Sequence, residues 1–243
     1  MRPSFSAARA LAARHLRSYA ETPAAYIALF VFFLYSSYLF ALPLFLDGQA
    51  TVKTLVDFAP LLLTLLIPAL TMGLIAEETR SGTYETLATL PLEDWDIVLG
   101  KFAAFAALAA LAVGALLFFP IVVAFLAQPP AGLDWGEALG TVGSLILLSW
   151  LLGSAGLFAS SWSKSQVIGY VGAFLLGFAL FMLGKVTQFL PGPAAPIADF
   201  LGFDSHARAL AKGVVDTRDL AYFASLTFAF LYLTVERLQR RRL

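Results

Sequence analysis

Long uncharged stretches alternate with short charged segments along the whole chain. The longest runs without Asp, Glu, Lys or Arg cover residues 22–46, 58–76, 102–133, 138–163, 165–184 and 220–235. A membrane core of about 30 Å needs roughly 20 apolar residues in a helix that rises about 1.5 Å per residue. The sixth run reaches that length only if Glu236 and Arg237 extend toward the interface. The pattern therefore predicts an all-α integral membrane protein with six transmembrane helices, at about 24–46, 57–76, 97–126, 139–161, 166–185 and 219–238.

Composition supports this class and excludes others. Hydrophobic residues make up 60% of the 243 positions, against about 45–50% in an ordinary soluble domain. No segment between the predicted spans is long enough for a separate soluble core, so we expect one membrane domain over residues 1–243. The 16 basic and 16 acidic residues cancel, which suggests no nucleic-acid partner. The absence of cysteine excludes disulfides and thiolate metal sites.

Basic residues are distributed unevenly between the two sides that six spans create. With a cytoplasmic N-terminus, eleven of the 16 Lys and Arg residues lie on the cytoplasmic side and five on the other. Because cytoplasmic loops carry an excess of Lys and Arg, this split predicts that both termini are cytoplasmic. The first uncharged run, with 25 residues, is too long for a signal-peptide core, so we expect no cleavage.

Residues 4–20 are predicted to form a helix on the membrane surface. At about 100° per residue, one arc of this helix carries apolar side chains, and Arg14 and Arg17 point away from it. The residues on the arc are Phe5, Ala8, Ala12, Leu16 and Tyr19. A basic leader without a fixed structural role is the alternative interpretation.

The stretch from Thr187 to Asp219 is the longest on the outer side. Three prolines and an apolar middle predict a broken or re-entrant element at the outer membrane face, over residues 191–203. Its marker residues are Pro191, Pro193, Pro196 and Phe200. The next piece is polar, and we expect Gly213 to cap it.

Glycines in the fourth and fifth predicted spans favour close helix packing. The sequence leaves open whether this packing lies within one subunit or between two. These glycines are Gly153, Gly156, Gly169, Gly172 and Gly177.

The inner loop after the second span, EETRSGTYETLATLPLEDWDIVLGK at residues 77–101, is too long for a turn and too regular for a linker. Ser81 and Gly82 are expected to break the helix of the second span. A short helix then follows over 83–90, and Pro91 ends it.

The short helix is predicted to lie across the cytoplasmic face, with Tyr84, Leu87 and Leu90 near one side. Glu93 or Asp94 can cap the helix of the third span. The residues alone favour a passive interfacial helix over an active lever.

The same loop resembles the coupling region of type-2 ABC transporter permeases. That family commonly shows a Glu-rich end to the second span, a Gly-Thr followed by a Glu and leucines, a Pro, and a Leu-Gly-Lys that opens the third span. The matching residues are Glu77, Glu78, Gly82, Thr83, Glu85, Leu87, Pro91, Leu99, Gly100 and Lys101.

The C-terminal part is similar to the gliding-motility-associated branch of these permeases. That branch has a Ser-His, a Gly-Val, a downstream Asp and an Asp-x-x-Tyr-Phe. The corresponding residues are Ser205, His206, Gly213, Val214, Asp216, Asp219 and Tyr222.

The resemblance implies a permease in the bacterial cytoplasmic (inner) membrane that pairs with a second permease subunit, identical or related, and binds a cytoplasmic ABC ATPase. An accessory membrane or periplasmic subunit is a further possible partner. ATP and Mg belong to the ATPase, and this chain is expected to bind no cofactor and to have no catalytic or metal site. The implied ATPase-coupling residues are Glu77, Glu78, Arg80, Gly82, Thr83, Tyr84, Glu85, Leu87, Leu90 and Pro91.

The sequence agrees with an external energy source. It contains no G-x-x-x-x-G-K-[ST], because Trp95 and Ala179 stand where the first glycine would precede the two Gly-Lys pairs. Export is the direction that the resemblance implies.

Three other functions stay open. The first is a membrane anchor or scaffold for a motility or secretion ATPase, without solute transport. The second is a membrane enzyme that acts on lipids, and the third is a related permease for haem or copper maturation. Asp57 is interpreted as a lone carboxylate at the interface, with a substrate or proton role as the alternative. His206 is interpreted as a loop contact, with catalysis as the alternative.

Overall fold

The computed structural model describes residues 5–46, 48, 52–83, 93–126, 134–189, 194–214 and 216–242. These described residues form helices and connecting turns, without strands. Five helices are long and apolar enough to cross a membrane. Their bounds are Pro23–Leu46, Thr54–Ser81, Asp94–Phe125, Trp135–Ser161 and Gln166–Val186.

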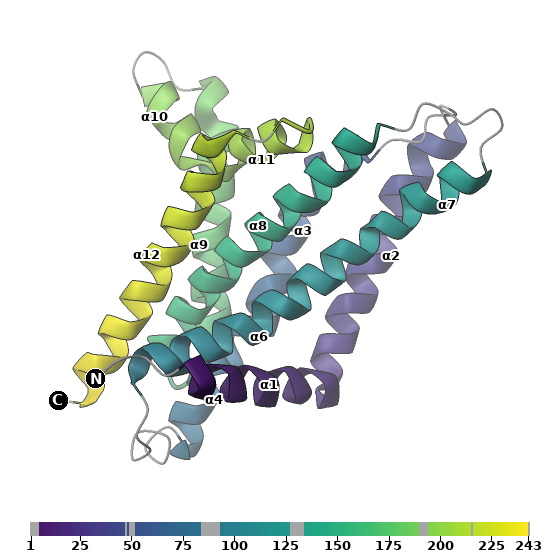
Figure 1. The fold of residues 1–243 in the computed structure, drawn as a ribbon. Coiled ribbons are helices and arrows are strands. Elements are labelled where there is room, and N and C mark those ends of the chain that lie inside the picture. Colours follow the sequence, from purple (N-terminus) through teal and green to yellow (C-terminus); the bar gives the residue numbers. More distant parts are fainter. Residues whose placement is uncertain are drawn as a thin grey trace.

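The long helices run back and forth between two ends of the molecule (Figure 1). We call these the α1 end, where α1 (Phe5–Glu21) lies, and the α11 end, where α11 (Phe203–Ala211) lies. The elements between them are α2 (Pro23–Leu46), α3 (Lys53–Thr71), α4 (Gly73–Ser81), α6 (Asp94–Gly114), η1 (Ala115–Leu117), α7 (Phe118–Leu126), α8 (Trp135–Ser161), α9 (Gln166–Val186), η2 (Thr187–Phe189) and α10 (Ala194–Leu201).

The last helix, α12 (Thr217–Arg242), also runs from the α11 end to the α1 end (Figure 1). It has 26 residues, which is long enough to span a membrane, and it packs along α8. It is not among the five helices that are apolar enough by composition, because its two ends are polar. The start of α1 and the end of α12 lie at the same end of the molecule.

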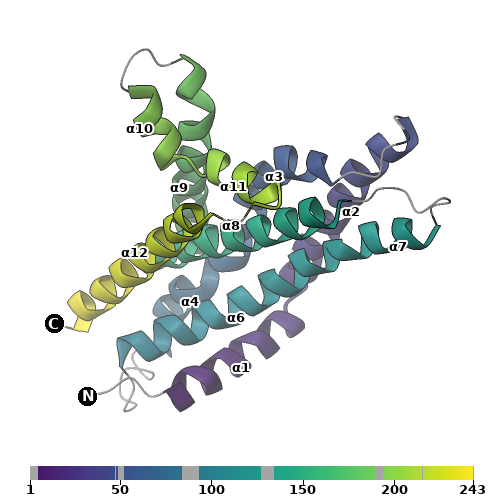
Figure 2. The same ribbon diagram turned by 45° about the horizontal axis from the view of Figure 1, so that its top comes forward.

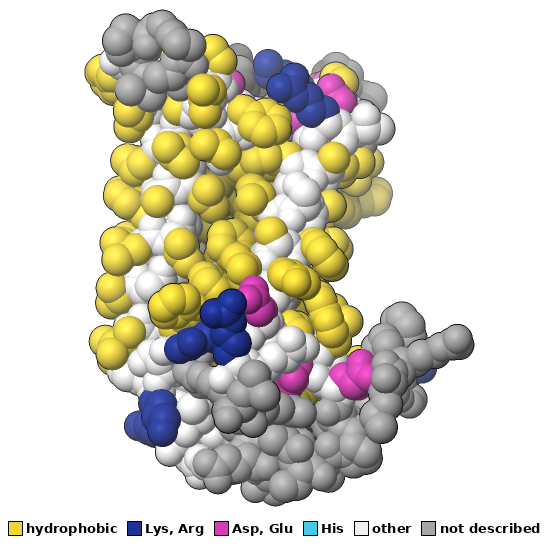
Figure 3. Space-filling view, turned by 90° about the vertical axis from the view of Figure 1, so that its left-hand side faces the viewer, with side chains coloured by type: hydrophobic (Ala, Val, Ile, Leu, Met, Phe, Trp, Pro, Cys, Tyr) yellow, Lys and Arg dark blue, Asp and Glu magenta, His cyan; other side chains and the backbone are white. Residues whose placement is uncertain are grey.

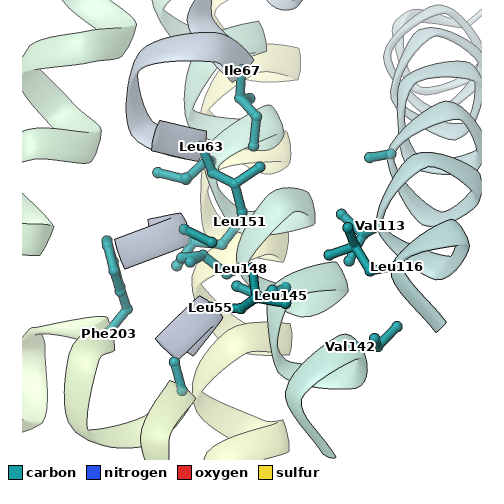
Figure 4. Close-up of a cluster of buried hydrophobic side chains, with 14 of the residues drawn as sticks. Leu55, Leu63, Ile67, Val113, Leu116, Val142, Leu145, Leu148, Leu151 and Phe203 are labelled. Atoms are coloured by element: carbon teal, nitrogen blue, oxygen red, sulfur yellow. The ribbon is translucent and has the colours of Figure 1, made fainter. Parts of the chain in front are cut away.

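Helix α8 is the centre of the fold and contacts α3, α4, α6, α9, α11 and α12. Leu145, Leu148 and Leu151, spaced by three residues, are fully buried and lie between α3 and the helix that carries Val113 and Leu116 (Figure 4). This repeat is the helical periodicity expected of a buried face.

Glycines on α8 and α9 face other helices of the same chain. A Cβ atom at Gly153 would lie 2.0 Å from the ring of Phe105, and one at Gly156 would lie 2.0 Å from Thr71 Oγ1. Gly169, Gly172 and Gly177 also have neighbours within the chain. The sequence left open whether these glycines pack within one subunit or between two. The structure shows that they pack within one subunit.

Some predicted helix boundaries agree with the structure, and others differ from it. The third span continues from α6 through the 3-10 turn η1 into α7, and this turn lies where Pro120 leaves the carbonyl of Leu116 without an α-helical donor. The third and fourth spans begin earlier than expected, at Asp94 and Trp135, because polar residues cap them before the apolar runs start. Asp134 accepts a hydrogen bond from the backbone N–H of Glu137.

Helix α1 confirms the predicted helix over residues 4–20 but corrects its apolar arc. Leu16 is 41% exposed, whereas Leu11, which the arc left out, is buried against Ile97 of α6. Arg14 and Arg17 are exposed. Helix α1 runs beside α6 (Figure 2), so its inner face is set by that helix rather than by the most hydrophobic arc.

A broad hydrophobic band covers the middle of the face where α12 lies, and most charged side chains lie nearer the two ends (Figure 3). Among the exposed apolar residues of α9 and α12 are Val167, Ile168, Val171, Leu175, Phe228, Tyr232 and Leu233. A surface of this kind fits a hydrocarbon environment, because large apolar patches are rare on soluble monomers.

Candidate functional site

The predicted coupling loop begins where α4 ends. Helix α4 stops at Ser81, and Gly82 follows in the left-handed region at φ 75°. This confirms the predicted helix break, because glycine adopts positive φ without steric cost. The hydroxyls of Ser81 and Thr83 lie 2.9 Å apart and form a hydrogen bond across the turn.

An ion pair joins α4 to α6 just inside this loop. Lys101 Nζ lies 2.6 Å from Glu78 Oε2 and also donates to the backbone carbonyl of Leu74. The Lys101 side chain is fully buried, and that of Glu78 is 17% exposed. Each charge is therefore compensated inside the protein, and removing either one leaves the other without a counter-charge.

Glu77 points to the other side of α4. It accepts hydrogen bonds from Arg80, at 2.9 Å, and from the side-chain amide of Gln166, at 2.6 Å. The second contact fastens α4 to the first residue of α9. Of the charged coupling residues that the structure describes, Glu78 is turned inward, Glu77 is half-exposed and Arg80 lies on the surface.

His15 of α1 packs against the same ion pair. Its Nε2 lies 3.8 Å from Glu78 Oε1. Burial, with further contributions from the positive charges of Lys101 and Arg14, lowers the pKa of His15 to about 4. His15 is therefore neutral at physiological pH, and its contact with Glu78 is not an ion pair there.

Ser160 of α8 binds the backbone where α3 passes into α4. Its hydroxyl accepts from the N–H groups of Ile75 and Ala76, at 3.1 and 3.0 Å, and donates to the carbonyl of Met72 at 2.8 Å. The side chain is fully buried. It satisfies backbone groups that the break between the two helices leaves without helical partners.

The beginning of α6 is fixed in two ways. The N–H of Glu93 donates to Asp96 Oδ2 at 3.2 Å in a capping box, as the acidic residues there predicted. At Gly100, a Cβ atom would lie 2.8 Å from Cβ of Leu11 and 3.0 Å from the carbonyl oxygen of Ala8. The Leu-Gly-Lys of the predicted motif therefore brings α1 close at Gly100 and pairs with α4 at Lys101.

The centre of the predicted coupling helix lies outside the described residues, which end at Thr83 and resume at Glu93. The predicted residues concerned are Tyr84, Glu85, Leu87, Leu90 and Pro91. Pro191 and Pro193 of the predicted outer element also lie outside.

At the α11 end, Pro196 and Phe200 lie in α10, which packs against the end of α9. Gly202 separates α10 from α11, and its Cβ position would be 2.4 Å from the backbone nitrogen of Gly184. Within the predicted element over 191–203, the structure thus describes helix α10, which ends before Gly202. Gly213, at φ 80°, ends α11 as expected.

His206 lies in helix α11, not in a loop as predicted. Its Nδ1 is 2.6 Å from Asp219 Oδ1, and its Nε2 is 3.1 Å from the carbonyl oxygen of Phe200. The ring stacks on Tyr222, whose hydroxyl donates to the carbonyl of Leu201. Ser205 bonds to the carbonyl of Asp199 instead. These contacts tie α10, α11 and α12 together, and they leave both ring nitrogens of His206 occupied.

Asp57 is not the lone carboxylate that the sequence suggested. Its Oδ1 lies 3.5 Å from Arg208 Nη2, and Arg208 Nε lies 3.2 Å from Asp204 Oδ2. Lys185 completes the chain of charges, 3.0 Å from Asp204 Oδ1. The network joins the start of α3 and the end of α9 through α11.

Sequence reasoning missed the partners of these residues. Lys101 carried a signal, because it is the last charge before the longest uncharged run. Ser160 and Gln166 carried none, since nothing in the sequence shows which backbone groups or carboxylates they reach.

The apolar helices, the hydrophobic band and the charged ends define a multi-pass membrane protein. The family model described as ABC-2 family transporter protein matches residues 36–203. Because the match covers more than half of the chain, the chain belongs to this family. The matched residues include the loop at 77–101 and stop before the residues that suggested the gliding-motility branch. No curated protein matches the chain in sequence.

Proposed function

We propose that the chain is the permease subunit of an ATP-driven ABC exporter, and that its α1 end faces the cytoplasm and binds a separate ATPase. Family membership supports the transporter class. In this proposal α12 is the sixth span, a second permease subunit completes the pathway, and ATP and Mg are bound by the ATPase. Helices α10 and α11 form the outer element that borders the exit path.

The observation that carries the coupling role is the tie between the two ends of the loop. The loop leaves α4 at Gly82 and joins α6 at Glu93, and the Glu78–Lys101 pair fastens these helices to each other. A partner that moves the loop therefore moves α4 and α6 together. Gly100 extends the contact to α1, and Ser160 extends it to α8. In the proposed mechanism, ATP binding shifts the equilibrium of this unit because the ATPase contacts its two positions differently.

Two glycines allow a matched test. Gly82 and Gly48 both have positive φ, 75° and 65°, and both have open space around the Cβ position. Valine imposes similar backbone strain at either site, but only Gly82 adjoins the loop. The chain has no cysteine, so Val214→Cys, 66% exposed at the α11 end, gives a single labelling site. The chain is labelled before it is reconstituted with the ATPase.

Addition of ATP and Mg should change the signal of the label in the parent protein and in Gly48→Val. In Gly82→Val the signal should stay constant while ATP hydrolysis continues. An unchanged response in Gly82→Val would remove the coupling role. An ATPase that binds and hydrolyses without any response in the parent protein would favour the scaffold function.

A further inference from the structure

A cavity of about 380 Å³ lies at the α1 end, between α1, the first turn of α2, the junction of α3 and α4, and the first residue of α9. Its walls include Arg14 and Ser18 of α1, Glu77 of α4, Gln166 of α9 and Leu70 of α3. The cavity thus lies at the ends of three helices that are apolar enough to cross a membrane, where lipid headgroups are expected.

One charge of the cavity has no partner in the described part of the chain. Glu77 is bound by Arg80 and Gln166, and Glu78 is bound by Lys101. Arg14 lines the cavity and makes no ion pair with any described carboxylate. The cavity therefore offers a cation and the neighbouring hydroxyl of Ser18 to an anion.

An apolar cleft begins where this cavity ends. The two share Leu70, and the cleft continues one turn deeper along α2, at Ala28. It is narrow, with a volume of about 40 Å³. Almost all of its wall is hydrophobic, from α2, α3, α6 and α8. Its lining includes Phe32, Leu63, Ile67, Phe105 and Val113.

We propose that the cavity and the cleft together bind one phospholipid from the membrane leaflet at the α1 end, with its phosphate on Arg14 and Ser18 and one acyl chain along the cleft. The order of the cavity and the cleft matches the two parts of a phospholipid. The cationic, polar cavity corresponds to the headgroup, and the apolar cleft corresponds to the acyl chain. The bilayer is the source, since the cleft is lined by helices that are long and apolar enough to cross it. This site goes beyond the proposed transport function and does not depend on ATP.

The test uses the full chain, purified in a neutral detergent, and follows thermal unfolding while dioleoyl phosphatidylglycerol is added. The phospholipid should raise Tm, whereas dioleoylglycerol, which lacks the phosphate, and inorganic phosphate, which lacks the chains, should not. In Arg14→Gln the apparent affinity should fall about tenfold, the loss expected for one charge-assisted contact. Arg17→Gln is the matched control, because it removes one charge from α1 at a residue outside the cavity.

A second pair of variants tests the cleft. Ala28→Phe fills its wall and should weaken lipid binding, whereas Leu111→Phe, at an exposed position of α6 outside the cleft, should not. Equal losses of phospholipid affinity in Arg14→Gln and Arg17→Gln would mean that α1 attracts the lipid only by its overall positive charge. That result would overturn the proposed site. The same rise in Tm with inorganic phosphate, or no rise with the phospholipid, would also overturn it.

Discussion

The two ends of the molecule hold their helices together by different means. At the α1 end, the linking side chains are out of water: Lys101 and Ser160 are fully buried, and Glu78 is 17% exposed. At the α11 end, the contact between His206 and Asp219 is also buried, but the pair that reaches α3 is not, because Asp57 and Arg208 are 43% and 44% exposed. Removing one partner of a buried ion pair strongly destabilises a protein, whereas exposed ion pairs contribute little to stability. The α1 end is therefore built as one rigid unit, which suits a region that transmits movement.

The α11 end combines the buried contact between His206 and Asp219 with close backbone contacts. Gly202 meets Gly184 of α9, and Gly213 meets Gly136 of α8. Such contacts place short helices accurately without long side chains. The difference between the ends is thus one of exposure: the ion pair that joins α4 to α6 is buried, whereas the pair that joins α3 to α11 is half-exposed.

The largest effect is expected from Lys101→Met, which leaves Glu78 inside without a counter-charge. Removing one partner of a buried pair costs about 3–5 kcal/mol. Unfolding in mixed micelles at increasing SDS should show this loss. The double variant Glu78→Gln with Lys101→Met should recover most of it, because no charge is then stranded. A loss no larger than that of an exposed pair would refute the contrast between the ends.

Acid should weaken the α1 end through His15. The pKa of His15 is lowered to about 4 in the folded protein, so the unfolded chain binds its proton first. Above pH 6.5 both states are neutral and His15 has no effect. Between pH 6.5 and 4 the folded state loses stability, by about 2–3 kcal/mol in total. His15→Gln should lack this part of the pH dependence. If the free energy of unfolding depended on pH in the same way in the variant and the parent, His15 would be solvated and the prediction would be wrong.

Gly202→Ala tests the glycine contact at the α11 end. The added methyl group would lie 2.4 Å from the nitrogen of Gly184, and backbone cannot move aside as a side chain can. We expect a loss of about 2 kcal/mol, typical of overpacking. Gly143→Ala in α8 is the control, since nothing lies within 4 Å of its Cβ position. It should be neutral or slightly stabilising. Equal stabilities would place α10 away from α9.

The smallest effect is expected from Asp57→Asn. The pair with Arg208 is half-exposed, so the loss should be below about 1 kcal/mol and should shrink at high salt. Unfolding at low and at high ionic strength measures it. A salt-independent loss of several kcal/mol would mean that the α11 end is as well shielded as the α1 end.

Much of the fold was predictable because the hydrophobic pattern is a local property. The five apolar helices and the break at Gly82 follow from runs of residues and from the backbone preferences of glycine. The sixth span and the loop helix stay predictions. The failures at Leu16, Asp57 and His206 share one cause. Each depends on which distant element packs alongside, and one sequence does not show that.

The candidate site shows the same contrast between local features, which the sequence predicts, and contacts between distant elements, which it does not. The motif at residues 77–101 was visible, but the inward turn of Glu78 was not, because Lys101 lies 23 positions further along the chain. Both residues matched the family pattern, yet only the packing of α4 against α6 shows that they bind each other.

The most direct test of the central claim is to purify the tagged full chain from membranes in mild detergent and to measure what ATPase comes with it. The permease function predicts that a nucleotide-binding subunit is recovered, and that it is lost when Tyr84, Glu85 and Leu87 are replaced together. Replacing Arg9 and Arg17 by Gln, on the exposed side of α1, serves as the control and should keep the subunit. Recovery of intact chain without any ATPase, in several detergents, would contradict the proposed function.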